Sequence, residues 1–169
     1  EDNGLNPEKK DYNEWAKRGL VTICPGTEVD DSMVVDWFKD LYVNYHLAPF
    51  KIGYDNWHSQ DFKKGIAELF GADVLERIGM DFNSLSGPMS VLESYLKEHM
   101  INYNNNPVDR WCLTNTAIRL NNIGQMMPVK KFGQSKNRID GTLGYIIAVA
   151  TYLRYKTDYL AIQGGQSAV

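Results

Sequence analysis

The sequence contains little of what a disulfide framework, a zinc module or a membrane protein requires. Its 169 residues include two cysteines, Cys24 and Cys112, and neither belongs to a Cys-x-x-Cys pair. This argues against zinc and favours free thiols. No apolar run approaches the roughly 20 residues of a membrane span. A glycine-rich phosphate loop and a nucleophile elbow are also missing, which excludes the common nucleotide-binding and serine-hydrolase motifs.

An excess of positive charge is missing as well. The chain has 18 basic and 21 acidic side chains, a net charge of −3, which excludes a histone-like protein that wraps nucleic acid by bulk charge. A local basic patch remains compatible with this total. The hydrophobic content of 43% and charged content of 23% are those of a globular protein. The length is that of one domain with its own core.

Strand-like and helix-like segments alternate along the chain. β-prone runs occupy residues 19–24, 50–55 and 73–79, and the first stops at the turn signal Pro25-Gly26. Helical stripes follow caps near residues 30–32, at Ser59 and at Ser84 or Ser86, where Pro88 is expected in the first turn. This order predicts an α/β layer fold with a mainly parallel sheet.

The last third of the chain departs from the alternation. A short helix is expected from Pro107, then a hairpin with arms at residues 116–120 and 125–131, then a mobile stretch at residues 132–137. The clearest helical stripe follows Asp140. We expect three parts: a lead-in over residues 1–11, a domain over residues 12–157, and a flexible tail over residues 158–169, frayed from Gln163 onward.

Two aspartates are candidates for chemistry. Asp55 lies at the carboxyl end of a predicted strand, where open α/β sheets place ligands, and a carboxylate there can bind Mg²⁺ or Mn²⁺. The alternative is a simple turn residue. Asp140 stands where the last helix begins, so it is either a ligand or an N-cap. The two residues are 85 positions apart, so no local motif links them.

The densest basic stretch lies just before Asp140. Lys130, Lys131, Lys136 and Arg138 are either a solvated loop or a set of phosphate contacts beside a metal site. His58 follows Asp55 closely enough to support it indirectly.

Several short motifs, in their order and spacing, resemble one known family. The chain is similar, over about residues 12–155, to the C-terminal nuclease domain of the large terminase subunit of tailed bacteriophages. The motifs are Tyr12-Asn13-Glu14-Trp15-Ala16, Gly19-Leu20, Pro25-Gly26, Val29-Asp30, Tyr54-Asp55-Asn56-Trp57, Leu85-Ser86-Gly87-Pro88-Met89, Asn106-Pro107 with Trp111 and Asn115, Pro128-Val129-Lys130-Lys131, and Arg138-Ile139-Asp140-Gly141.

The resemblance implies a ribonuclease H-like fold, with a mixed sheet flanked by helices and a hairpin excursion before the last helix. It implies an endonuclease that cuts double-stranded concatemeric DNA by two-metal phosphodiester hydrolysis with Mg²⁺ or Mn²⁺. Asp55 and Asp140 match the second and third of the family's metal-binding acids. The four basic residues would contact DNA. The implied partners are the terminase motor domain, the small terminase subunit and the portal, in the cytoplasm of the bacterial host.

One departure limits these expectations. The family's first strand, with its own catalytic aspartate, should precede Tyr12, and residues 1–10 show no strand pattern. The isolated chain is therefore expected to lack that strand, to bind metal weakly and to cut DNA poorly or not at all. Two alternatives stay open: a non-catalytic module that docks on DNA or the portal, and a resolvase-type enzyme of the same fold. The hairpin excursion favours a terminase over a resolvase.

Overall fold

The computed structural model describes residues 8–26, 29–56, 59–134 and 136–166. Within them, helices alternate with short strands. The elements are α1 (Tyr12–Lys17), α2 (Asp31–Tyr45), β1 (Ile52–Tyr54), α3 (Gln60–Phe70), the 3₁₀ turn η1 (Ala72–Val74), β2 (Leu75–Arg77), α4 (Phe82–Lys97), α5 (Pro107–Asn115), β3 (Thr116–Leu120), β4 (Met126–Lys130), the 3₁₀ turn η2 (Lys131–Gly133) and α6 (Asp140–Gln166).

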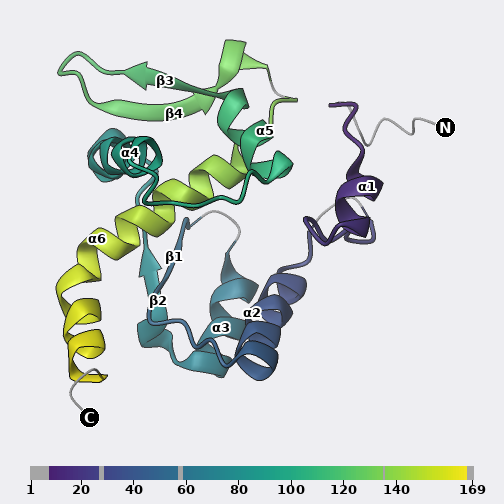
Figure 1. Ribbon diagram of the computed structural model, residues 1–169, viewed down its shortest axis with the longest axis vertical. Helices are drawn as coiled ribbons and strands as arrows, with labels where there is room; N and C mark the ends of the chain where they lie inside the picture. Colours follow the sequence, from purple (N-terminus) through teal and green to yellow (C-terminus); the bar gives the residue numbers. More distant parts are fainter. Residues whose placement is uncertain (1–7, 27–28, 57–58, 135, 167–169) are drawn as a thin grey trace.

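The long helix α6 runs between the two halves of the molecule (Figure 1). The hairpin, α4 and α5 lie on one side of it, and the β1–β2 pair with α2 and α3 lies on the other. None of the helices in the described part of the chain is both long and apolar enough to cross a membrane.

The strands form two small sheets in the described residues. β1 and β2 are parallel, with Gly53 opposite Glu76, and β3 and β4 form an antiparallel hairpin, with Ile118 opposite Pro128. The α/β class and the hairpin before the last helix are confirmed. Parallel and antiparallel pairing both occur, but in separate sheets. Pro128 fits in β4 because its missing N–H lies on the edge turned away from β3.

Successive residues of β1 face different helices. Ile52 is buried with Ile66 of α3, whereas a Cβ added at Gly53 would lie 2.1 Å from Oγ1 of Thr151 in α6. This is the period of two expected of a strand. The parallel pair is therefore enclosed between α3 and α6, as parallel strands generally are.

The main core lies between α4 and α6. Its buried members are all apolar and come from these helices and the segment just after β2: Ile78, Leu85, Met89, Leu92, Ile146, Val149 and Ala150. Each fully buried aliphatic side chain of this kind contributes about 1.5–3 kcal/mol by leaving water. This core fixes α6 as the rigid element of the molecule.

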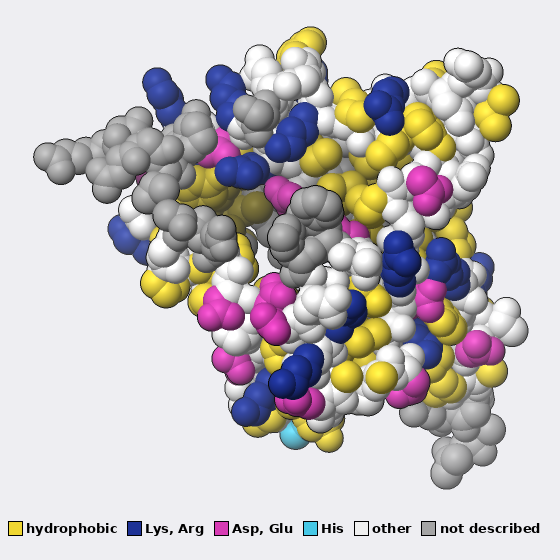
Figure 2. Space-filling view, turned by 180° about the vertical axis from the view of Figure 1, so that it is seen from behind, with side chains coloured by type: hydrophobic (Ala, Val, Ile, Leu, Met, Phe, Trp, Pro, Cys, Tyr) yellow, Lys and Arg dark blue, Asp and Glu magenta, His cyan; other side chains and the backbone are white. Residues whose placement is uncertain are grey.

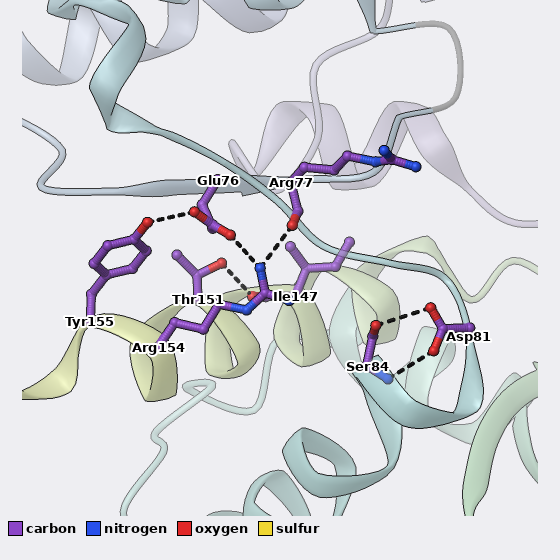
Figure 3. Close-up of polar contacts among 8 residues, drawn as sticks. All are labelled: Glu76, Arg77, Asp81, Ser84, Ile147, Thr151, Arg154 and Tyr155. Atoms are coloured by element: carbon purple, nitrogen blue, oxygen red, sulfur yellow. Dashed lines mark hydrogen bonds and ion pairs between the residues drawn. The ribbon is translucent and has the colours of Figure 1, made fainter.

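The C-terminal half of α6 is linked to β2 by polar contacts (Figure 3). The Tyr155 hydroxyl donates to Glu76 at 2.5 Å, and Arg154 forms an ion pair with Glu76 and donates to the Arg77 carbonyl at 2.9 Å. Burial alone would raise the pKa of Glu76, but these hydrogen bonds outweigh burial and hold the pKa below its ordinary value.

Residues 19–24 do not form the predicted strand. They are irregular, and the Leu20 amide instead donates to the Trp15 carbonyl, which closes the end of α1. A β-prone run becomes a strand only when another strand pairs with it, and among the described residues none lies beside this segment.

Two helix boundaries also differ from the prediction. α4 begins at Phe82 rather than after Ser84 or Ser86, because Asp81 is its N-cap and accepts from the Ser84 amide at 3.0 Å. Pro88 therefore lies inside the helix and not in its first turn.

At the other end of the chain, residues 158–166 are helical rather than an irregular tail, because Tyr159 packs on Phe50 and Tyr152. The end of the predicted tail, residues 167–169, lies outside the described residues.

Candidate metal and DNA site

Asp55 follows directly after β1 and is half-buried. The strand that carries it has little freedom, because the Gly53 backbone approaches α6 so closely that no side chain fits there. β1, which ends one residue before Asp55, thus packs on α6 at Ile147 and Thr151, about two and three turns beyond Asp140.

Asp140 was predicted as the N-cap of the last helix. It is instead the first residue of that helix, α6. The Leu143 amide donates to the Ile139 carbonyl at 2.9 Å, so Ile139, and not Asp140, takes the N-cap position. Asp140 is exposed, and no described side chain hydrogen-bonds its carboxylate. A negative charge in the first helical turn is favourable, and this carboxylate is accessible to a ligand.

The turn that carries Asp140 packs against α5. The Tyr145 hydroxyl donates to Asp109 at 3.1 Å, and burial together with this bond raises the pKa of Tyr145 to about 12. Burial also raises the pKa of Cys112, and the charges of Asp140 and Asp109 add to the effect. Cys112 is therefore a packing residue that stays protonated, and the carboxylates of Asp109 and Asp140 lie near it.

Arg138 has a structural partner. Its Nε donates to Glu8 at 2.7 Å, and the Glu8 side chain is only 4% exposed whereas that of Arg138 is 51% exposed. The hydrogen bond to Glu8 raises the pKa of Arg138 further. Residues 8–11 were expected to be a solvated lead-in, but Glu8 is buried in this contact, while residues 1–7 lie outside the described part.

The other basic residues lie on the path from the hairpin to α6. Lys130 ends β4 and is half-buried, Lys131 begins η2, and Lys136 is exposed. Figure 2 shows Lys and Arg side chains gathered at the upper left of the rear face, over the region of α1 and η2, with acidic side chains among them. This distribution is the local basic patch that a net charge of −3 allows.

The residues of this candidate site offer some of the donor groups that a divalent metal needs. Mg²⁺ is commonly bound through one or two carboxylates together with water and substrate phosphates, and Asp55 and Asp140 offer such oxygens. Within residues 8–26, 29–56, 59–134 and 136–166, no group of three or more His, Cys, Asp or Glu side chains is arranged to hold a metal. Asp55 and Asp140 are therefore candidate donors, and the described residues form no group of three ligands around them.

Some residues that hold the candidate site in place could not be predicted from the sequence. Glu8 is 130 positions from Arg138, and no sequence signal links them. Asp109 has no motif of its own either, although the glycine after Asp140 does indicate a close approach of another element. His58, considered as a supporting residue for Asp55, lies outside the described residues.

Comparisons with known proteins agree on one family. The family model described as "Terminase large subunit, endonuclease domain" matches residues 3–155. The chain belongs to this family. The resemblance read from the sequence motifs is thus confirmed, and residues 3–155 match the terminase nuclease domain.

Two relatives and one structure are similar to this nuclease domain. The large terminase subunit of Enterobacteria phage HK97 is 26% identical over 141 residues, which are 82% of this chain and 27% of that protein. Protein YmfN of Escherichia coli K12 is 23% identical over 151 residues, which are 87% of this chain and 31% of that protein.

The crystal structure of the HK97 bacteriophage large terminase superimposes with a TM-score of 0.70 at 23% identity, covering 83% of this chain and 29% of that one. This likeness shows that the two share a fold over the matched part. The chain spans less than a third of the length of each of these proteins.

Proposed function

We propose that this nuclease domain is a divalent-metal-dependent endonuclease of a phage DNA-packaging terminase. Its substrate would be double-stranded concatemeric DNA, and its chemistry two-metal phosphodiester hydrolysis. The main support for the proposal is the position of Asp140 within a domain that matches the family's endonuclease model. Its exposed carboxylate begins a helix that packs on β1, the strand that ends at Asp55.

Asp55 and Asp140 are proposed as the carboxylates that hold Mg²⁺ or Mn²⁺. When bound, the metal supplies an activated water and stabilises the leaving oxygen. The chain itself offers oxygen donors on two rigid elements, β1 and α6, and a nearby set of cations. Rigid attachment suits this role because small displacements of catalytic groups cost much of the rate.

Lys130, Lys131, Lys136 and Arg138 are proposed to contact DNA phosphates. Contacts of this kind position the duplex without reading sequence. Arg138 differs from the lysines because Glu8 fixes its Nε, so only its remaining exposed nitrogens would be available to a phosphate. The proposed partners besides DNA are the terminase motor domain, the small terminase subunit and the portal, in the host cytoplasm.

One observation favours a second function. No three-ligand group occurs among the described residues, which suits a non-catalytic module that docks on DNA or the portal. The two functions differ in whether the aspartates matter for cleavage.

A plasmid-nicking assay with Mn²⁺ or Mg²⁺ tests the proposal. We expect weak nicking that requires the added metal, and Asp55→Asn and Asp140→Asn should each abolish it. Nicking that survives both substitutions would overturn the site assignment. Binding of duplex DNA without any nicking would favour the docking module.

The basic stretch has its own test. A Lys130→Ala/Lys131→Ala variant should bind a DNA duplex several-fold more weakly, and the dependence of log Kd on log salt should fall by about two. Lys156→Ala, which removes an exposed lysine of α6, is the control and should change neither quantity. An unchanged salt slope in the double variant would exclude these lysines from the DNA interface.

A further inference from the structure

A chain of hydrogen bonds joins α5, β3 and the first turn of α6. The Thr116 hydroxyl lies 2.8 Å from the Cys112 carbonyl and 2.9 Å from the Thr142 hydroxyl. The carbonyl can only accept, and the Thr116 hydroxyl has one hydrogen to donate. The arrangement that satisfies all three groups therefore has Thr116 donating to Cys112 and Thr142 donating to Thr116.

The same turn is held by a close steric contact. A Cβ added at Gly141 would lie 3.1 Å from Sγ and 3.2 Å from Cβ of Cys112, whereas Gly144, one turn further along α6, has no atom within 4 Å of such a position. The helix thus approaches α5 most closely at the residue that follows Asp140.

The backbone just before Asp140 is also held in place, at Arg138. The Asn115 side-chain amide, at the end of α5, donates to the Arg138 carbonyl at 3.1 Å. Residues 138, 141 and 142 are therefore all fixed by α5 or by the first residue of β3, while Asp140 between them is exposed. The contacts restrain the backbone on both sides and leave the carboxylate only its own side-chain rotations.

The Thr116–Thr142 pair is an unusual choice for a buried contact between secondary-structure elements. Thr142 is only 5% exposed, and a valine would fill the same volume without needing a partner. A hydrogen bond between two hydroxyls adds only modest net stability, but it is directional. It can therefore specify the rotation of the first turn of α6 relative to α5, which apolar packing specifies less sharply.

We propose that Thr116 and Thr142 are positioning residues for Asp140. By fixing the first turn of α6 they would hold the carboxylate in the orientation needed to bind the metal, without touching metal or DNA themselves. This inference rests on the proposed function, because it assumes that Asp140 is a metal ligand. Groups that orient a metal ligand in this way commonly affect metal affinity by about 10–100-fold.

Mn²⁺ binding by the whole chain tests the proposal, with paramagnetic broadening of the Asp140, Gly141 and Thr142 amide signals as the readout. Thr116→Val and Thr142→Val should each raise the Mn²⁺ concentration for half-broadening about tenfold, and Thr116→Ser, which keeps the hydroxyl, should restore it. Thr114→Val removes an exposed hydroxyl of α5 that donates to the Trp111 carbonyl of its own helix, and it should have no effect. Thermal unfolding of each variant shows whether it is folded.

The outcomes separate the two proposals. If Asp140→Asn does not change Mn²⁺ binding, the metal site is wrong and the positioning role falls with it. If Asp140→Asn reduces binding but Thr116→Val and Thr142→Val do not, only the positioning role is overturned. An equal loss from Thr114→Val, or no rescue by Thr116→Ser, would also overturn it, because the effect would then not depend on the Thr116–Thr142 hydrogen bond. Should Thr142→Val fail to fold, the two substitutions at Thr116 still decide the question.

Discussion

The first turn of α6 and the middle of the same helix are held by different kinds of contact. The N-terminal end of α6 depends on directional bonds, one between Thr142 and Thr116 and one from the Tyr145 hydroxyl to Asp109, and Asp140 is exposed there. The middle is packed by apolar residues of α4 and by the bare backbone of Gly53. One region presents an exposed carboxylate, and the other contains the main apolar core.

This difference has a practical consequence for mutagenesis. Changes in the first turn should affect metal binding and cleavage more than stability, because few apolar contacts are lost there. Changes in the middle should affect stability first, because close packing tolerates neither cavities nor added atoms. Substitutions of the same chemical type placed in the two regions therefore test the comparison.

The largest effect is expected from Asp140→Asn. Loss of a metal-binding carboxylate removes several kcal/mol of transition-state stabilisation, so cleavage should fall about a thousandfold. The melting temperature should change little, because Asp140 is exposed. Asp158→Asn, at an exposed position further along α6, is the matched control and should leave cleavage unchanged. Equal rates for the two variants would contradict a catalytic role for Asp140.

Gly53→Ala should give the largest loss of stability. The new methyl group would meet Thr151 Oγ1 at 2.1 Å and Ile147 Cγ2 at 2.7 Å, and such overpacking costs about 1–3 kcal/mol or more. Urea unfolding measures this loss. Gly144→Ala, at a position on α6 with no atom near the new methyl group, should instead stabilise the protein by up to about 1 kcal/mol. A stable Gly53→Ala variant would mean that β1 and α6 are further apart than described.

Gly141→Ala should combine both kinds of effect. Its methyl group would lie 3.1 Å from Cys112 Sγ, so a loss of about 1 kcal/mol is expected in place of the usual gain from alanine in a helix. Mn²⁺ affinity should also fall, because the first turn must move away from α5. Cys112→Ala makes room for the methyl group and should reverse both losses when combined with Gly141→Ala. A simple addition of the two single effects would show that these residues do not interact.

The smallest effect is expected at the C-terminal half of α6. The pKa of Glu76 is lowered in the native state, so its contacts stabilise the protein above the ordinary pKa of glutamate. This stabilisation is lost as the pH falls through the lowered value. Glu76→Gln should therefore lower the melting temperature at pH 7 and have little effect at pH 3, with a free-energy change below about 1 kcal/mol. A difference that persists at pH 3 would mean that the charge of Glu76 is not its source.

The helices and the hairpin could be predicted because their signals are local. The stripe after Asp30, the glycine that ends α3 at Gly71 and the turn between Leu120 and Met126 all concern residues close in sequence. Each of these elements occurs where predicted. The strand predicted at residues 19–24 does not form, because a strand depends on a partner that its own sequence does not identify.

The candidate site could be predicted only as residue types. The sequence indicates Asp55 and Asp140 as acids at the ends of elements, and the structure places them on a strand and a helix that pack together. The contacts that hold Asp140 could not be predicted, because Thr116, Asn115 and Glu8 are separated from it by long stretches of chain. Such pairs depend on the tertiary fold and leave no periodic pattern.

Asp55 and Asp140 are proposed to share a divalent metal site. Anomalous scattering from crystals soaked with Mn²⁺ would locate the metal directly. We expect a manganese peak within about 2.5 Å of a carboxylate oxygen of each residue. Peaks found only elsewhere, or the two carboxylates on opposite sides of the β1–β2 sheet, would contradict it.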